Sequence, residues 1–138
     1  VTDAAYRRTV DGLKNAYDNK VPLTFSTDAD YWVEGMTRGQ VCLEFLRTWK
    51  DAGIPNADVI RAMTTNGYKV SGTEQTRGPL KAGFIADIIA MPGNPLDNLE
   101  ALKDVRFVMK DGKVFKQDGV MTPAEFFNGG PVNGWRIR

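Results

Sequence analysis

The chain has 138 residues, 42% hydrophobic and 25% charged, which is enough for one globular domain with a hydrophobic core. Its formal net charge is +1 and no apolar run is long enough to cross a bilayer, so neither a nucleic acid nor a membrane is expected as a partner. Histidine is absent and Cys42 is the one cysteine, so the chain alone cannot form a common zinc site, a histidine-dependent triad or an internal disulfide.

The first predicted elements are a helix and a strand. Tyr6, Val10, Leu13 and Tyr17 form one apolar stripe at helical spacing, which predicts an amphipathic helix over residues 3–18. After a short link, the run of apolar, β-branched and aromatic residues at 21–26 predicts a buried strand. It ends in Thr-Asp-Ala-Asp at 27–30, and α/β proteins place their chemistry at the C-terminal ends of strands. This stretch is therefore the main candidate for a functional site.

Two more helices are predicted in the residues before the turn-rich link that follows. Thr37 and Gln40 have the spacing of a capping box, and the helix that they start is expected to run to about Ala52. Gly53 and Pro55 follow and end it. A second helix is predicted from about Asn56, with a break at residues 64–67 that leads into a short turn ending at Gly72.

The rest of the chain, from residue 78 onward, is predicted to contain mainly strands. A turn-rich link at 78–83 is a candidate domain boundary, and a strand is predicted at 86–91. Asp97 is expected to cap a short helix, and Asp111-Gly112 to join strands 105–110 and 113–117 in a hairpin. Residues 122–125 have the pattern of another capping box, and the aromatic residues beyond it could pack on missing structure or across a dimer: Phe126, Phe127 and Trp135.

Five stretches, taken in order, resemble the C-terminal part of metal-dependent amidohydrolases of the imidazolonepropionase and Xaa-Pro dipeptidase type. The most specific is Lys81-Ala82-Gly83-Phe84-Ile85-Ala86-Asp87. It belongs to a stretch at residues 78–89; the other stretches are weak singly but keep the order of the family, and they lie at residues 21–28, 52–55, 62–67, and 94–97 followed by 105–116.

The resemblance implies an α/β fold that is the C-terminal part of a larger one. Residues 1–77 would form the last helix-strand-helix portion of a (β/α)8 barrel, residues 78–121 the C-terminal strands of a composite β-sandwich, and residues 122–138 a tail. A complete barrel needs about 250 residues, and the chain begins with Val1 rather than Met, so we expect a piece of a longer protein or a processed one.

The resemblance also implies roles at the candidate site. Asp28 would be a ligand of a divalent metal, zinc by analogy with the family, and the general base that accepts the proton of the attacking water. Asp30, Tyr31 and Trp32 would contact a small-molecule or dipeptide substrate. The histidine ligands would come from the remainder of the parent barrel, so the chain alone is expected to hold no metal and to be inactive.

Plainer interpretations stay open at this point. Asp28 could simply cap a loop, and Tyr31 and Trp32 could only cover the barrel mouth. Asp87 is expected to cap the turn at Gly83, and Cys42 to pack in the core. For the whole chain, the alternative to an enzyme fragment is a non-catalytic structural module that forms a homo-oligomer through exposed strand edges.

Overall fold

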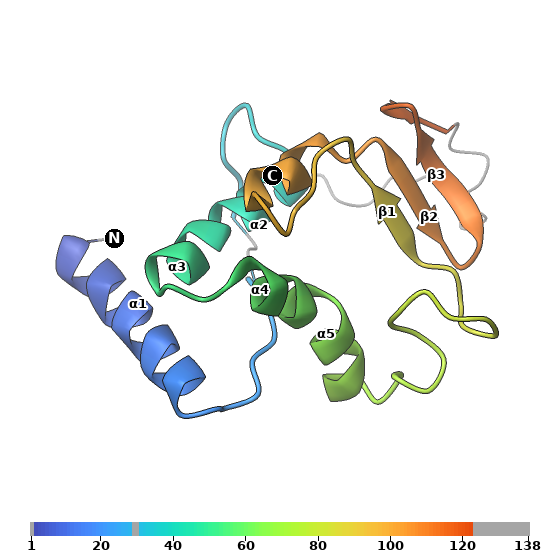
Figure 1. The fold of residues 1–138 in the computed structure, drawn as a ribbon. Helices are drawn as coiled ribbons and strands as arrows, with labels where there is room; N and C mark the ends of the chain where they lie inside the picture. The colour runs from blue at the N-terminus through green and yellow to red at the C-terminus, as the bar shows by residue number, and fades with distance from the viewer. Residues whose placement is uncertain (1, 29–30, 123–138) are drawn as a thin grey trace.

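The computed structural model describes residues 2–28 and 31–122, and Figure 1 shows their arrangement. Helices occupy one side and an antiparallel sheet the other, with a long connection between them. The helical elements are α1 (Asp3–Asp18), α2 (Arg38–Glu44), α3 (Leu46–Asp51), α4 (Asn56–Met63), α5 (Thr65–Val70) and the 3-10 helix η1 (Leu99–Asp104). The strands are β1 (Ile88–Ala90), β2 (Phe107–Lys110), β3 (Lys113–Gln117) and β4 (Val120–Met121).

Helix α1 forms as predicted over residues 3–18. Its apolar stripe packs on the core, and a tyrosine near each end fastens it to the next helices. Tyr6 donates a hydrogen bond of 2.8 Å to Asp51 at the end of α3, and Tyr17 donates one of 2.7 Å to Asp58 in α4. The hydrogen bond to Asp58 raises the pKa of Tyr17, because the carboxylate accepts from the neutral phenol.

The predicted helix after Thr37 starts correctly but is interrupted. Thr37 and Gln40 form the capping box, with the Gln40 backbone N–H 3.3 Å from the Thr37 hydroxyl oxygen. At Phe45 the backbone N–H bonds to Cys42, three residues back rather than four, and this tighter turn divides the helix into α2 and α3. Gly53 ends α3 with a φ of +72°, which glycine adopts readily.

The predicted break after α4 is narrower than expected. Only Thr64 leaves helical geometry, at φ −124° and ψ −93°, and α5 follows at once. The prediction of a plain turn from residue 64 to Gly72 was therefore wrong. Because α4 and α5 are separated by a single residue, both can bind the same neighbouring segment, α4 through the Ala62 carbonyl and α5 through the Asn66 side chain.

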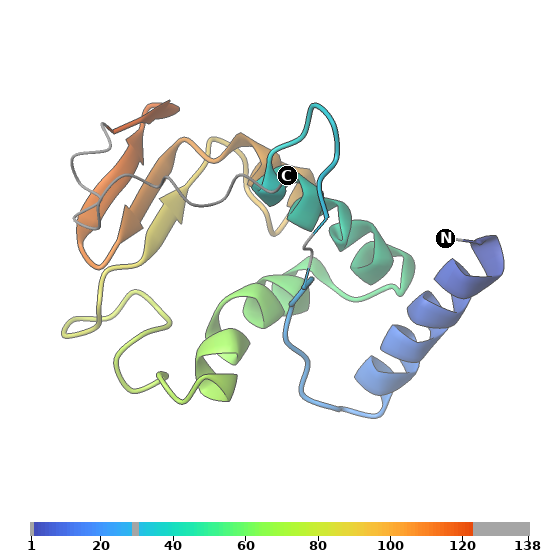
Figure 2. The same cartoon turned by 180° about the vertical axis from the view of Figure 1, so that it is seen from behind.

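The hydrophobic core lies between the helices and η1. Val59 in α4 is fully buried, and η1 reaches into the same core from the sheet side of the molecule, where Figure 2 shows it against α2. The buried members are Leu46, Trp49, Ala52, Ile54, Val59, Ala62, Leu99 and Leu102. The cap of η1 is Asn98, whose side chain accepts a hydrogen bond of 3.0 Å from the Glu100 N–H, so the prediction that Asp97 caps it was wrong by one residue.

The sheet has the order β1-β2-β3-β4, with every neighbouring pair antiparallel. The hairpin at Asp111-Gly112 is confirmed, with φ values of +52° and +74° that suit a type I′ turn. Strand β4 was not predicted, although the same dipeptide signal occurs before it. Asp118 and Gly119 have φ values of +51° and +83° and return the chain from β3 to β4.

The predicted strand at residues 21–26 is not a strand in this structure. The segment is extended, but the described residues beside it belong to helices, and a strand requires a neighbouring strand to complete its ladder. The hydrophobic pattern correctly indicates an extended, half-buried segment, and it is the regular pairing that is missing.

Asp87 joins the sheet to the connection that follows α5. Its carboxylate accepts a hydrogen bond of 2.8 Å from the Asp111 N–H in the hairpin turn, pairs with Arg77 and receives a hydrogen bond of 3.3 Å from Tyr68. Arg77 also pairs with Asp111. Asp87 thus has a structural role, but it supports the Asp111 turn, and the prediction that it caps the Gly83 turn was wrong.

Several predictions lie outside the described residues or are not tested. The capping box at 122–125 extends beyond the described part, and Phe126, Phe127 and Trp135 lie outside it altogether. The division at residues 77 and 121 stays a prediction. In residues 2–28 and 31–122, no helix is long and apolar enough to span a membrane.

We expect Asp87→Asn to lower the free energy of unfolding by about 1–2 kcal/mol at neutral pH, because it removes the charge from a half-buried hydrogen-bonded group. The Asp111 N–H and Arg77 hold the pKa of Asp87 below its ordinary value. The unsubstituted chain is therefore more stable than the variant above about pH 4, the pKa of aspartate in the unfolded chain. This difference in the free energy of unfolding is lost as the pH falls through the lower pKa that Asp87 has in the folded chain.

Urea unfolding of both chains from about pH 7 down to about pH 2 measures this difference. Asp118→Asn is the matched control, because asparagine also tolerates the positive φ at that turn, and it should leave stability unchanged at every pH. Equal stability of the unsubstituted and Asp87→Asn chains at neutral pH would contradict the role given to Asp87.

Candidate functional site

The extended segment at residues 21–28 alternates between two environments from Phe25 onward, whereas Thr24 is half-buried and Val21 is exposed. Leu23 and Phe25 pack against the core, and the Phe25 ring lies 5.7 Å from the Trp49 ring in α3. Ser26 and Asp28 are exposed. This period of two is that of a strand with one covered face, even though no strand pairs with it among the described residues.

Polar contacts also hold Leu23, Phe25 and Thr27, which are alternate residues of this segment. Asn66 in α5 donates a side-chain hydrogen bond of 2.8 Å to the Leu23 carbonyl, and the Phe25 N–H donates one of 3.0 Å to the carbonyl of Ala62 in α4. The Thr27 hydroxyl lies 3.3 Å from the Cys42 thiol in α2. The segment is therefore fixed on its covered face up to the residue that precedes Asp28.

Asp28 ends this segment in an unusual backbone conformation, with a φ of +41°. Its side chain is exposed. Aspartate tolerates a left-handed backbone better than most residues, but the conformation still costs free energy. An exposed carboxylate on a strained backbone, directly after an anchored segment, is suited to binding a cation or accepting a proton.

The other predicted site residues are less fixed. Tyr31 and Trp32 are 53% and 74% exposed, so neither is packed as a core residue, and Asp30 lies outside the described residues. Tyr31 lines a groove of about 380 Å³ together with Tyr6 of α1 and Phe45. The predicted contacts of Asp30, Tyr31 and Trp32 with a substrate stay predictions.

A complete metal site does not fit the described part of the chain. Within it, no three His, Cys, Asp or Glu side chains come close enough together to hold a metal ion. The sequence has no histidine anywhere. Asp28 can serve as one carboxylate ligand, but further ligands would have to come from residues outside this part.

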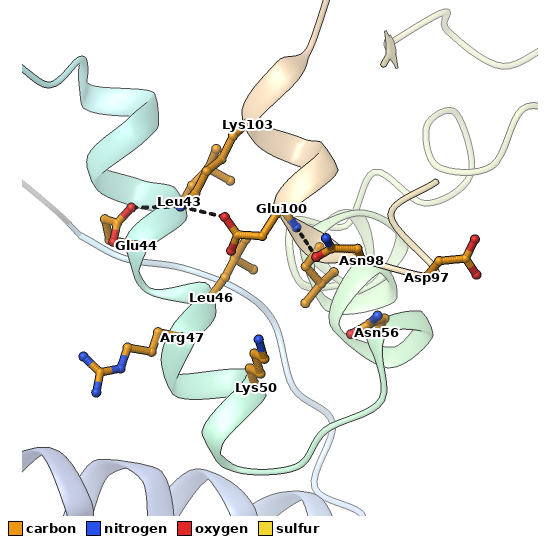
Figure 3. A pocket seen from close by; sticks show the side chains of 11 residues that line it. Leu43, Glu44, Leu46, Arg47, Lys50, Asn56, Asp97, Asn98, Glu100 and Lys103 are labelled. Atoms are coloured by element: carbon orange, nitrogen blue, oxygen red, sulfur yellow. Dashed lines mark hydrogen bonds and ion pairs between the residues drawn. The ribbon is translucent and has the colours of Figure 1, made fainter. Parts of the chain in front are cut away.

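A separate cavity of about 310 Å³ lies between α2, α3 and η1, and Figure 3 shows its lining. Lys103 sits between Glu44 and Glu100 at 3.2 and 2.9 Å, and these partners, Glu100 first, raise its pKa. Arg47 and Asp97 point away from the cavity in this view. Lys103 is thus shared between two carboxylates, and none of the predicted site residues lines the cavity.

Sequence reasoning missed Asn66 as part of the site. Its type and place, a polar amide beside a helix break, indicate a surface turn, and only the structure brings it to Leu23. Cys42 is half-buried and is not one of the residues that form the core or pack against it, and its contact with Thr27 was not foreseen.

Comparison with known proteins gives the family. The sequence model described as "Amidohydrolase family" matches residues 3–115, which is most of the chain. The chain belongs to the amidohydrolase family. The resemblance inferred from the sequence is thereby confirmed.

Individual amidohydrolases show the same similarity over a limited length. Ochratoxinase of Aspergillus niger is 31% identical over 86 residues, which is 59% of this chain and 18% of that protein. Its crystal structure superposes with a TM-score of 0.61 at 28% identity, over 80% of this chain and 25% of that one. A crystal structure of a Xaa-Pro dipeptidase with bound methionine in the active site gives a TM-score of 0.69 at 28% identity, over 78% of this chain and 25% of that one. The chain thus spans a quarter or less of these relatives.

We expect Asp28→Gly to leave the free energy of unfolding unchanged or to raise it by about 0.5 kcal/mol. Glycine removes the left-handed cost of about 1 kcal/mol, and this gain is partly offset by the greater freedom of glycine in the unfolded chain.

Ser26→Gly is the matched control, because Ser26 lies in the same segment without a positive φ, so only the entropic cost of glycine remains. It should lower stability by about 0.5–1 kcal/mol. Urea unfolding of the two variants checks this, and a larger loss for Asp28→Gly than for Ser26→Gly would contradict strain at Asp28.

Proposed function

We propose that this chain is part of a metal-dependent amidohydrolase that hydrolyses C–N bonds in peptides, amides or carbamate-like compounds. The observation that carries the proposal is the match to the amidohydrolase family over residues 3–115, together with Asp28 at the end of an anchored, extended segment. The similarity to a Xaa-Pro dipeptidase and to ochratoxinase supports a small-molecule or dipeptide substrate.

The alternation along Val21–Asp28 supports the proposed architecture. In a (β/α)8 barrel, each strand turns alternate side chains toward the outer helices and toward the interior. Leu23 and Phe25 face helices here, so Thr24, Ser26 and Asp28 would face the barrel interior. Residues 1–77 would then be the last part of the barrel, and the sheet β1–β4 would be part of a composite β-sandwich. The remainder of the parent barrel would be the main partner of this chain.

Asp28 would take two roles in the parent enzyme, that of a metal ligand and that of the general base. A divalent metal, zinc by analogy, would polarise the scissile carbonyl and make water more acidic. The Asp28 carboxylate would accept the proton of the attacking water and pass it to the leaving nitrogen, so that the carboxylate is regenerated. Asp30, Tyr31 and Trp32 follow in the same loop and would contact the substrate.

We propose that the 138 residues alone are inactive, because their sequence has no histidine to join Asp28 in a ligand set. The test compares this chain with the longest natural chain that contains it, each supplied with zinc and assayed on a panel of dipeptides and N-acyl amino acids. We expect hydrolysis by the longer chain only. We expect Asp28→Asn in that longer chain to lower kcat/KM by about 10²–10⁴-fold, because the general base is lost.

Asp97→Asn is the control for this assay, because Asp97 is a carboxylate far along the sequence in a loop before η1, and it should leave kcat/KM unchanged. Hydrolysis by the 138-residue chain, or full activity of Asp28→Asn, would overturn the proposal. A naturally occurring protein whose chain ends with these 138 residues and that has no hydrolase activity would instead indicate the structural module that forms an oligomer.

A further inference from the structure

Asn66 and Ala62 make two hydrogen bonds to the extended segment. The Ala62 carbonyl in α4 accepts from the Phe25 N–H, and the Asn66 side chain in α5 donates to the Leu23 carbonyl. The later helical residue binds the earlier residue of the segment, so the two bonds run in opposite directions along the chain and fall on alternate residues of the segment.

Two such bonds define a register. A slip of the segment by one residue would bring Thr24 and Ser26 to the helices and turn Leu23 and Phe25 away from the core, because side chains of an extended segment alternate. It would also move Asp28 from the exposed side toward the helices. No neighbouring strand among the described residues opposes such a slip, so the contacts with the helices must prevent it.

Besides the packing of Leu23 and Phe25, the hydrogen bond of Asn66 is the side-chain contact that contributes most to this register. The bond from Phe25 goes to the main chain of Ala62 and is not a property of the Ala62 side chain. The Thr27–Cys42 contact involves a thiol, which is a weak hydrogen-bonding group. Asn66 is half-buried and supplies an amide donor at 2.8 Å, which satisfies the Leu23 carbonyl.

We propose that Asn66 is a positioning residue that fixes the register of residues 23–28 and thereby the place of the Asp28 carboxylate. The proposal deepens the function proposed above and rests on it for its catalytic meaning. A crevice of about 150 Å³ beneath Val21 and Leu23, which Asn66 also lines, leaves room for the segment to shift when the amide bond is lost.

The test replaces Asn66 with aspartate, which keeps the shape but substitutes an acceptor for the donor that faces Leu23. The chain offers a matched control, since Asn56 donates the same kind of bond, at 2.9 Å, to the Leu96 carbonyl. Asn56→Asp removes a similar bond elsewhere and reports the general effect of losing one.

Two readouts follow the far end of the segment. Cys42 is the one cysteine of the chain and lies against Thr27, so its rate of alkylation by iodoacetamide reports opening there. The ¹H–¹⁵N resonances of Thr27 and Asp28 report their position directly. In Asn66→Asp we expect alkylation to be about five-fold faster or more, with both resonances shifted, whereas Asn56→Asp leaves the rate and the resonances as they are.

Asn66→Ala is the second variant, since alanine keeps α5 helical and removes the donor without adding a charge, and circular dichroism verifies its fold. Unchanged alkylation and resonances in both Asn66 variants would overturn the proposal, as would an equal effect of Asn56→Asp. These readouts do not depend on hydrolysis, so a failure of the role of Asp28 in catalysis is distinguishable from a failure of the register role of Asn66.

Discussion

The hydrogen bonds of the segment Val21–Asp28 are the constraint on which the rest of the site depends. An extended chain has backbone donors and acceptors along both edges, and each buried one must find a partner. Here the partners come from helices, through the Ala62 carbonyl and the Asn66 amide, rather than from another strand. Because these bonds fall on alternate residues, they also decide which side chains face the core and which remain exposed.

The helices and the sheet meet through two different kinds of contact. Leu99 and Leu102 of η1 enter the core of the helical part, which is a hydrophobic attachment without directional demands. Asp87, Arg77 and Asp111 make the second attachment, in which charge and hydrogen-bond geometry specify the position of the hairpin turn. The sheet is thus held at both ends of β1, while the long connection from α5 lies outside the core.

Local features of the fold were predictable from the sequence, and features that depend on distant partners were not. The α1 stripe, the Thr37 capping box and the Asp111-Gly112 hairpin each follow from a few adjacent residues, and all three are confirmed. The strand at 21–26 was wrong because pairing requires a neighbour that the described residues do not include. Strand β4 had a local signal in Asp118-Gly119, which was overlooked rather than absent.

Some residues of the candidate site were likewise predictable from the sequence, and others were not. Asp28 became a candidate by its position after an apolar run and by resemblance to the family, and the structure adds its exposure and its positive φ. Asn66 could not be found from the sequence, because its contact with Leu23 joins residues 43 positions apart. Residues that support a site from another element need the fold before they can be recognised.

Amide hydrogen exchange at Phe25 tests the central claim most directly, because its N–H is the backbone donor that fastens the segment to α4. We expect this amide to exchange at least about ten-fold more slowly, after correction for intrinsic rates, than the amide of Trp32 in the exposed loop that follows. Exchange of Phe25 as fast as that of Trp32 would show that the segment is not anchored, and would contradict the account.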